Sequence, residues 1–547
     1  MARDPDVGDA YVFDLVEDDA PTGDAPEVQD GSASPVMPGR KRRLTAQVAG
    51  ILAIVLGTGI AVDGALDHQR MERMRDIPGG VADLSSPLAE TWAWSNAVGP
   101  GESTTDVAVL GDVLAVESDD GLVALDPATG DVAWTVPLRA EADCGPMVPA
   151  AWLDPTTELL VCLQGTGRDR EVVAVGPDGP TSAPRALDAA DARRYGVPHT
   201  GPDGTVLRAR RVGPASAVDL SGAVCTSADE CTGMITEGRD LVLRAEDAAT
   251  GAERWTVTVP FRTVDATQCT RTYGASWGSS ETRLVLSGQL APDAFGARVT
   301  ADLIDLSGCG VQAAVTPDGT VLGAELEPGT SLVMSLREGG YAGTSFDGAA
   351  GATLYAADGD VVGEITGYPR RPRATDQSEP ATVLGVDEPG RRLRAYAADG
   401  TPRWDVTLQS GGQDFLAQVG DTAVITTGAG KVRGLDLATG EERWVWDGSD
   451  PSAEDDVGYF GSAHVVQAFT DGEVVLLLTE GETGSTQGLV ALDASSGAVV
   501  WERAGGGTVT SFDPTDRGLV EQGIVGGLVA VDGNLLEVTP RGVRGLG

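Results

Sequence analysis

The chain has 547 residues, of which 41% are apolar and 74 are glycine, while aromatic residues make up only 5%. This length exceeds one ordinary compact domain and fits a large repeat domain, and many glycines with few large side chains indicate tight turns between short strands. The formal net charge of −43 argues against nucleic acid as a partner, because phosphate binding needs clustered Lys and Arg.

Residues 1–43 are predicted to form a disordered cytoplasmic tail. Residues 1–38 are acidic and rich in Pro, Gly and Ser, and such a composition cannot bury a core. One stretch differs: Ala10–Asp19, AYVFDLVEDD, sets apolar residues among acids. It is either a segment that folds onto a partner groove or an ordinary solvated tail.

A membrane span is predicted directly after this tail, over residues 44–62. The cations RKRR at 40–43 precede LTAQVAGILAIVLGTGIAV, which carries no charge and measures about 28 Å as a helix. Cations beside a span stay in the cytoplasm, so we expect a single-pass protein of the cell membrane whose later residues are extracytoplasmic. Residues 63–87 would be a short stalk. A cleaved signal peptide is the main alternative, and a buried helix of a soluble domain is a weaker one.

Internal repeats dominate residues 88–547. The regular copies read GLVALDPATGDVAWTVPL at 121–138, LVLRAEDAATGAERWTVTV at 241–259, KVRGLDLATGEERWVWD at 431–447 and GLVALDASSGAVVWERA at 488–504, with a shortened copy at 391–408. Each contains an alternating apolar strand, a turn of the Asp-x-x-Thr-Gly kind and a second strand that carries Trp. Because the alternation has the period of a strand and Asp and Gly suit a turn, each copy predicts a β-hairpin.

The tryptophans set a period of forty residues. Trp94 and Trp134 are forty residues apart, as are Trp404 and Trp444. Forty residues is about the length of a four-stranded propeller blade. We therefore predict an all-β fold, a β-propeller of about eight four-stranded blades, with seven possible if two weak units merge. The approximate units are 101–138, 144–186, 198–260, 269–316, 317–366, 380–408, 412–446 and 458–503.

Two predicted strand segments lie outside these units. One is the early strand at residues 90–96, and the other is the group of C-terminal strands within 507–540. Pairing the two segments would close the ring and remove both free sheet edges. That closure could also make a further blade.

The repeat motif Ala-x-Asp-x-x-Thr-Gly-x-x-x-Trp resembles that of the quinoprotein, or PQQ-like, propeller family, whose BamB-like members carry it too. Two copies match fully, Gly434 replaces the Ala of a third, and Ser496 replaces the Thr of a fourth. The resemblance implies that the motif Trp stacks between blades and is structural. The scarcity of Lys suggests an actinobacterial type of member. The structural repeat residues are Asp126, Gly130, Trp134, Asp247, Gly251, Trp255, Asp436, Gly440, Trp444, Asp493, Gly497 and Trp501.

All six cysteines follow the predicted span, which suits disulfides in an oxidising compartment. Sequence alone cannot choose among the possible pairings, of which neighbour pairing is the simplest. Neighbour pairing predicts Cys144–Cys162, Cys225–Cys231 and Cys269–Cys309. A zinc site is the alternative, but no CxxC spacing occurs and the histidines are only His68, His199 and His464.

The sequence contains no catalytic constellation that we can identify. In quinone-dependent relatives the quinone lies under a disulfide between adjacent cysteines and beside a calcium ion, and no two cysteines here are adjacent. GASWG at 274–278 fits the G-x-S-x-G pattern around Ser276, but that elbow needs a strand-to-helix turn in an α/β sheet. A carboxylate pair for glycoside hydrolysis stays open, with no residue singled out.

These observations predict a membrane-anchored extracytoplasmic β-propeller that acts as a non-catalytic binding or scaffolding module at the cell envelope. We expect no cofactor and no metal, and an envelope protein or polymer as partner. The alternative is a quinone- and calcium-dependent oxidoreductase. A hydrolase that uses Ser276 or a carboxylate pair is a second alternative.

Overall fold

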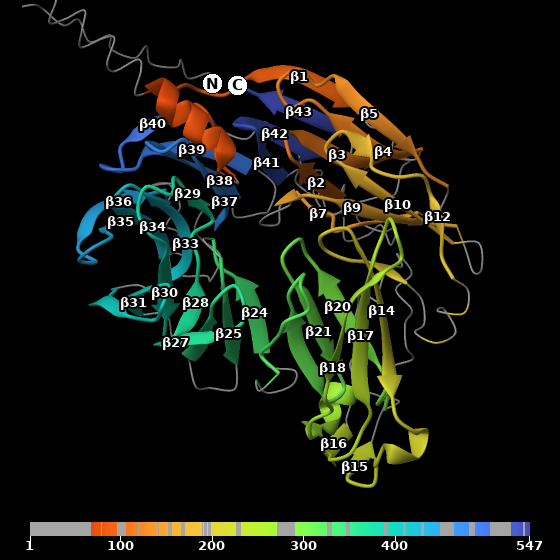
Figure 1. The fold of residues 1–547 in the computed structure, drawn as a ribbon. Coiled ribbons are helices and arrows are strands. Elements are labelled where there is room, and N and C mark those ends of the chain that lie inside the picture. Colours follow the sequence, from red (N-terminus) through yellow and green to blue (C-terminus); the bar gives the residue numbers. More distant parts are fainter. Residues whose placement is uncertain are drawn as a thin grey trace, which may run out of the picture. The chain divides into compact units, whose positions relative to one another are not determined.

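The computed structural model describes most of residues 67–547, in strands joined by turns (Figure 1). Outside the described residues lie 1–66, with the predicted tail and span, and internal stretches that include 96–105, 271–289, 451–463 and 504–526. The chain divides into two compact units, Met1–Ala65 and Leu66–Gly547, and the described strands all belong to the second unit. Among the described residues, no helix is both long and apolar enough to cross a membrane.

The first half of the second unit forms four sheets of four or more strands, which we number in chain order. Their strand pairs are antiparallel except for one short parallel pair in sheet 1. Sheet 1 contains β2 (Asp106–Leu110), β3 (Val113–Ser118), β4 (Gly121–Leu125) and β5 (Val132–Pro137), with β7 (Val148–Pro149) and β8 (Thr156–Thr157) added to β2. Sheet 2 contains β6 (Asp143–Gly145), β9 (Leu160–Gln164), β10 (Glu171–Gly176), β11 (Gly179–Pro180) and β12 (Arg185–Ala186). Sheet 3 contains β13 (His199–Thr200), β14 (Thr205–Val212), β17 (Asp240–Asp247) and β18 (Glu253–Val259). Sheet 4 contains β20 (Phe295–Val299), β21 (Ile304–Gly308), β22 (Val311–Val315) and β23 (Val321–Leu322).

The second half repeats this arrangement four times. Sheet 5 contains β24 (Ser331–Ser335), β25 (Tyr341–Ser345), β26 (Gly351–Tyr355) and β27 (Val361–Thr366). Sheet 6 contains β28 (Tyr368–Arg370), β30 (Thr382–Val386), β31 (Arg392–Ala397) and β32 (Pro402–Thr407). Sheet 7 contains β29 (Ala374–Thr375), β33 (Gly412–Val419), β34 (Thr422–Thr427), β35 (Lys431–Asp436) and β36 (Glu442–Asp447). Sheet 8 contains β37 (His464–Thr470), β38 (Val474–Glu480), β39 (Gln487–Asp493) and β40 (Val499–Arg503).

Both ends of this unit meet in a further sheet, which we call the terminal sheet. It contains β1 (Glu90–Ser95), β41 (Gly527–Val531), β42 (Asn534–Thr539) and β43 (Gly542–Leu546). β1 pairs antiparallel with β43, so that Trp94 lies opposite Val543. The early strand therefore joins the sheet of the C-terminal strands, as predicted, but its direct partner β43 lies beyond the predicted segment 507–540. The pairing covers one edge of β1 and one edge of β43.

The described residues thus contain nine sheets of four or more strands and one three-stranded sheet. The predicted units overlap sheets 1 to 8 in order, and the terminal sheet is the possible further blade. Three boundaries differ. β7 and β8 pair with β2 of sheet 1, although the predicted unit 144–186 contains them, and β23 pairs within sheet 4, although residues 317–322 were assigned to the next unit. β28 and β29 lie between the predicted units 317–366 and 380–408. The number of blades in a complete ring stays a prediction.

Each sheet buries apolar side chains against both of its neighbours. Leu243 of sheet 3 packs in one cluster with Leu306 of sheet 4, and Leu476 of sheet 8 packs in another with Leu535 of the terminal sheet. The alternation predicted for the first strand of each copy does not hold for β4, which is buried along its whole length. Leu122 and Ala124 pack against sheet 2, and Val123 and Leu125 pack against the terminal sheet, so GLVAL is a continuous apolar run. Because burying one such side chain contributes about 1.5–3 kcal/mol, the interfaces between sheets form the core.

Residues 67–88 pack against sheet 8 and the terminal sheet, and we call them the strap. The strap begins with a helix over residues 67–76. Met74 and Leu84 are fully buried, and Val81 and Leu88 join the cluster that links sheet 8 to the terminal sheet. Met74, Val81 and Leu84, which the predicted stalk contained, are therefore buried.

Candidate interaction site

The repeat motif builds the same turn in each regular copy. In sheet 1 the Asp126 carboxylate accepts hydrogen bonds from the backbone N–H groups of Ala128 and Thr129, both at 2.9 Å, and Gly130 adopts a φ of +74°. The turns at Asp247, Asp436 and Asp493 repeat the contact with the residue three positions on. The motif aspartates are thus placed in turns, as predicted from their position.

The motif tryptophans join neighbouring sheets through one recurring contact. In each case the indole Nε1–H donates to a backbone carbonyl in the next turn along the chain of sheets. Trp134 donates to Pro177 at 2.6 Å and Trp255 to Pro317 at 2.8 Å, and both acceptors lie in the neighbouring sheet. Trp92, Trp404, Trp444 and Trp501 make the corresponding contact. The structure therefore places these residues between sheets, as the resemblance implied.

An arginine occupies this position between sheets 2 and 3, where no motif Trp occurs. Arg185 Nε donates to the carbonyl of Ala248 at 2.8 Å, and its Nη2 lies 3.2 Å from Glu246. A Cβ on Gly251 would meet the Arg185 guanidinium, just as other motif glycines meet an indole. Sequence reasoning missed Arg185 because a Trp was sought. Spacing gave no signal, because the separation between donor and acceptor varies from 33 residues at Trp404 to 62 at Trp255.

Buried ionisable side chains also gather between sheets 2 and 3. Arg208 on β14 is 1% exposed, and its Nε lies 3.6 Å from Glu246, the acid that Arg185 also contacts. Burial, together with the charges of Arg170 and Arg208, lowers the pKa of His199 to about 2. This imidazole is therefore neutral near pH 7. The group links two sheets and presents no exposed acid or base.

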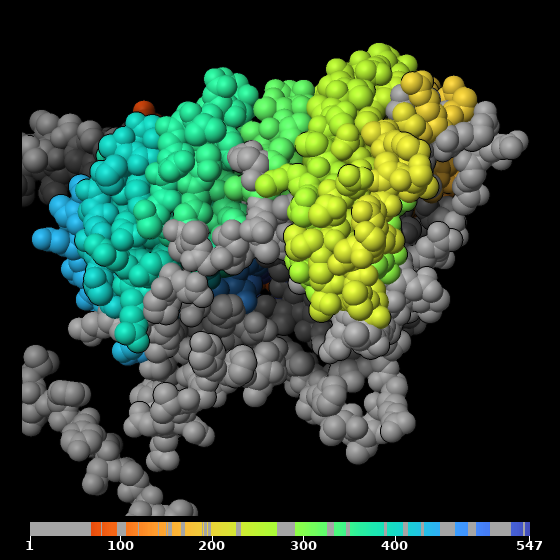
Figure 2. All heavy atoms as spheres, turned by 90° about the horizontal axis from the view of Figure 1, so that it is seen from below, coloured from red at the N-terminus to blue at the C-terminus, as the bar shows by residue number. Residues whose placement is uncertain are grey.

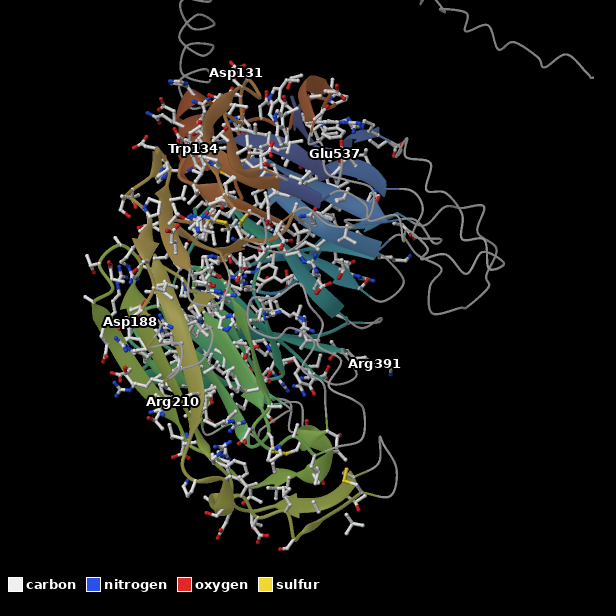
Figure 3. The ribbon with its side chains drawn as sticks, turned by 90° about the vertical axis from the view of Figure 1, so that its right-hand side faces the viewer. Asp131, Trp134, Asp188, Arg210, Arg391 and Glu537 are labelled. Atoms are coloured by element: carbon white, nitrogen blue, oxygen red, sulfur yellow. A yellow bond between two sulfur atoms is a disulfide. The ribbon has the colours of Figure 1, made fainter. Side chains whose placement is uncertain are left out.

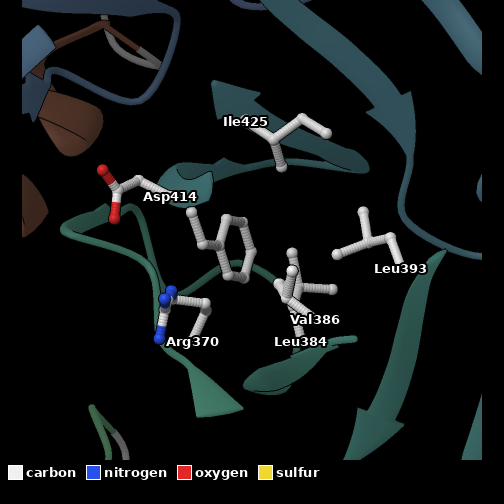
Figure 4. Close-up of a pocket in the computed structure, with 7 residues that line it drawn as sticks. Arg370, Leu384, Val386, Leu393, Asp414 and Ile425 are labelled. Atoms are coloured by element: carbon white, nitrogen blue, oxygen red, sulfur yellow. The ribbon is translucent and has the colours of Figure 1, made fainter. Parts of the chain in front are cut away.

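A small hollow lies between sheets 6 and 7 (Figure 4). Arg370 and Asp414 lie on one side of it, and Leu384 and Leu393 lie on the other. Its volume is about 10 Å³, which is room for about one water molecule. The hollow is therefore too small for an organic substrate or cofactor.

Among the residues that the structure describes, none of the catalytic or metal sites considered from the sequence is assembled. Within them, no group of three or more His, Cys, Asp or Glu side chains could hold a metal ion. Ser276 and its GASWG segment lie outside the described residues. The cysteines pair as Cys144–Cys162, Cys225–Cys231 and Cys269–Cys309. None of these pairs joins cysteines that are adjacent in the sequence.

These three disulfides confirm the predicted neighbour pairing, and two of them brace an insert in sheet 3. The insert is a three-stranded sheet of β15 (Ala223–Cys225), β16 (Cys231–Ile235) and β19 (Val264–Asp265), with 3-10 helices η1 (Ala215–Ala217) and η2 (Ala266–Cys269). It continues from the far ends of β14 and β17 (Figures 1 and 3). Figure 2 shows sheet 3 and its insert, in yellow and yellow-green, as one continuous surface.

The base of the insert is fixed to sheet 4. Cys269 at the end of η2 is bonded to Cys309, which lies in the turn between β21 and β22. Arg211 donates to the carbonyls of Arg239, Ala294 and Cys309, at 2.8 to 3.1 Å. A guanidinium that bridges three carbonyls holds the base of the insert to its neighbour.

The insert has one buried face and one exposed face. Cys231 and Ile235 of β16 are buried with Val264. On the other face Val224 is 59% exposed and Met234 is 45% exposed, and Met234 lies opposite Asp265 of β19. This exposed face combines apolar side chains with an exposed acid on a base that disulfides and Arg211 hold. We name the surface of Val224, Thr232, Met234 and Asp265 the insert face.

Comparison with known proteins identifies the repeats. Residues 344–511 match the PQQ-type family described as outer membrane protein assembly factor BamB. This match covers sheets 6 to 8 and part of sheet 5. No match was found among curated proteins.

Several solved structures are similar to the chain. BamB from Moraxella catarrhalis is 20% identical, over 38% of this chain and 60% of that one, with a TM-score of 0.25. Quinohemoprotein alcohol dehydrogenase from Comamonas testosteroni is 13% identical over 84% and 76% of the two chains, with a TM-score of 0.31. Sqt1 from Saccharomyces cerevisiae is 8% identical over 84% and 99%, with a TM-score of 0.35. The chain thus spans less than two thirds of the length of the Moraxella BamB.

Proposed function

We propose that this chain, whose residues 344–511 carry PQQ-type repeats, is a membrane-anchored β-propeller that acts as a non-catalytic binding module at the cell envelope. In this proposal the sheets are the blades, residues 44–62 span the membrane, and the insert face is the docking surface. The observation that carries the proposal is the insert itself: a disulfide-braced sheet that exposes Val224 and Met234.

The rigidity of the insert supports binding. A surface that is already ordered loses little conformational entropy on association, so fewer contacts are needed for a given affinity. The Cys225–Cys231 disulfide closes the β15–β16 hairpin directly below the exposed Val224. The Cys269–Cys309 disulfide fixes the other end of the insert to sheet 4. The insert face is therefore a preorganised surface.

The chemistry of the insert face favours a partner protein whose contact surface has an apolar centre surrounded by basic side chains. Methionine adapts its shape to varied apolar partners, and Met234 stands beside Asp265. Asp219 and Glu237, which bridge to each other through their backbones, are also exposed nearby in the insert. Acids around an apolar centre steer a partner with complementary Lys and Arg.

Substitution at the insert face tests this function. We expect the double variant Val224→Ser and Met234→Ser to lose a stable complex that the native chain forms in envelope membranes, measured as its native mass after extraction. The matched control is Val361→Ser with Val362→Ser, because these valines on β27 are 62% and 41% exposed and lie outside the insert. A complex that survives the first pair and is lost with the control would contradict the proposal.

The oxidoreductase alternative rests on the repeats alone. Calorimetry of the purified protein with quinone and calcium, followed by a dye-reduction assay with alcohols and sugars, separates the two functions. Tight quinone binding with substrate-dependent reduction of the dye would show that the protein is an oxidoreductase and would overturn the proposed binding function.

The membrane topology has its own test, a reporter that is active only outside the cytoplasm, fused after Gly547. We expect this fusion to be active.

A further inference from the structure

The terminal sheet lacks the turn with which sheets 1, 2, 4, 7 and 8 receive a tryptophan from the preceding sheet. In sheet 7 the Trp404 indole donates to Leu437, the residue after the motif Asp436, and in sheet 8 Trp444 donates to Ala494, the residue after Asp493. Each acceptor lies in the turn that leads to the outer strand of its own sheet. In the terminal sheet the outer strand is β1, which comes from the other end of the unit, so no such turn connects it to β43.

The strap supplies this missing turn. Trp501 of sheet 8 donates to the carbonyl of Leu84 at 2.7 Å, and Leu84 follows Asp83. The Asp83 carboxylate accepts from the backbone N–H of Ser85 at 2.8 Å, as the Asp126 carboxylate accepts from Ala128. Asp83 and Leu84 thus take the places of the motif Asp and its following residue. The repeat pattern in the sequence does not predict this turn, because the Thr-Gly part of the motif is absent from the strap.

The strap bonds to both sheets that it joins. Val81 N–H donates to the Thr470 carbonyl of sheet 8 at 3.0 Å, and Ala82 N–H donates to the Gly533 carbonyl of the terminal sheet at 2.8 Å. Arg503 of sheet 8 donates to the Leu88 carbonyl at 2.8 Å. Adjacent residues of the strap therefore bond to different sheets.

A buried carboxylate of sheet 8, that of Asp471, binds the strap through a hydrogen bond and an ion pair. Asp471 is fully buried and accepts from Leu84 N–H at 2.9 Å. Its partner in charge is Arg70 of the strap helix, at 3.4 Å, and Arg70 also contacts the exposed Glu473. Replacing Arg70 alone would leave Asp471 buried without its cation, a strongly unfavourable state.

We infer that the strap is a clamp across the seam between sheet 8 and the terminal sheet, and that detaching the strap opens the molecule at this seam first. At the seam of sheets 7 and 8 the Trp acceptor belongs to sheet 8 itself, and at the seam of sheets 3 and 4 a disulfide adds a covalent link. At the clamped seam the acceptors of Trp501 and Arg503 and the cation of Asp471 all lie on the strap.

Hydrogen exchange of the full-length chain tests the clamp. Trp501→Phe removes the donor to Leu84 and keeps an aromatic ring, and Arg70→Met removes the cation of Asp471. We expect each variant to raise exchange roughly fivefold to tenfold in the strap, as for the loss of one hydrogen bond. Hydrogen exchange should also rise in β38 and β41, the strands on either side of the seam, in step with the rise in the strap.

The matched control is Trp444→Phe, which removes the same bond at a seam without a strap. We expect this variant to leave exchange of the strap unchanged. If the strap variants exchange faster in the strap alone, with β38 and β41 unaffected, the strap is an attached segment and not a clamp. If Trp444→Phe loosens the strap as much as Trp501→Phe does, opening is not localised to this seam, and the inference is wrong. Binding at the insert face does not enter either outcome.

Discussion

At the scale of single residues, each motif glycine meets two requirements at once. Gly497 adopts a φ of +69°, a region that side chains with a Cβ disfavour. A Cβ there would also lie 2.4 Å from the Trp444 ring of the preceding sheet. The turn and the tryptophan of neighbouring repeats therefore depend on the same glycine, which explains why Gly and Trp recur together at fixed spacing.

The buried motif tryptophans should contribute most to stability. We predict that Trp444→Ala lowers the free energy of unfolding by about 3–5 kcal/mol, because Trp444 is 8% exposed and its removal leaves a cavity. Trp134→Ala should cost less, because this side chain is only partly buried. Urea unfolding of both variants checks the order. Equal values, or no loss in Trp444→Ala, would contradict the role assigned to the indole.

The turn aspartates make stability depend on pH. Hydrogen bonds from Arg443, Thr439 and the turn backbone lower the pKa of Asp436 to about 2. Because this value lies below that of an unfolded aspartate, about 4, the contribution is complete above about pH 4 and is lost as the pH falls towards 2. We predict that Asp436→Asn flattens this part of the stability curve, measured by urea unfolding at several pH values. Arg443→Met should flatten it as well, and a slope like that of the native chain in both variants would count against this origin.

At the scale of elements, the contact between sheets 2 and 3 shows a different solution for the same position. Arg185 makes the backbone contact that a motif Trp makes elsewhere and adds a contact to the buried Glu246. We predict that Arg185→Met lowers the free energy of unfolding by about 1.5–3 kcal/mol, because hydrogen bonds that involve a charged group are lost. The control is Arg254→Met, whose ion pairs are partly exposed and should contribute at most about 1 kcal/mol. Equal losses of unfolding free energy in Arg185→Met and Arg254→Met would contradict the role assigned to Arg185 between sheets 2 and 3.

The insert should depend on its tether to sheet 4. We predict that replacing both Cys269 and Cys309 by Ala speeds hydrogen exchange in β16 and β19 and lowers the free energy of unfolding by about 2–4 kcal/mol. The control removes Cys144 and Cys162, a pair within sheet 2, and should leave exchange of the insert unchanged. Titration of the native chain under denaturing conditions should find little free thiol. A full set of six thiols would reject all three disulfides.

At the scale of the whole molecule, local patterns predicted the hairpins and the disulfides, because alternation, turn residues and cysteine order are visible along the chain. The pairing of the early strand with the C-terminal strands was predicted by another argument: both segments lay outside the repeat units and would otherwise leave free sheet edges. The sequence could not reveal that Met74, Val81 and Leu84 of the predicted stalk are buried. Leu84 acts there through its backbone carbonyl, which any residue would supply. The role of Arg185 could not be predicted for a similar reason, because its acceptor is the backbone carbonyl of Ala248.

The insert was also missed, although the sequence carries a trace of it. The predicted unit 198–260 is longer than the forty-residue period, and two cysteine pairs lie in and just after it. Such an excess indicates extra structure within a repeat, but it does not say which face is exposed. That face depends on the packing of Cys231 and Ile235 against Val264, a contact between residues distant in sequence.

The most direct test of the proposed binding function is photo-crosslinking in native envelope membranes from a photo-reactive residue placed at position 234. We predict one discrete crosslinked protein from this position, and none from the same residue placed at position 361 on the exposed edge of sheet 5. Loss of the product in the variant Val224→Ser would tie it to the insert face. No product from position 234, or the same products from both positions, would contradict a docking surface on the insert.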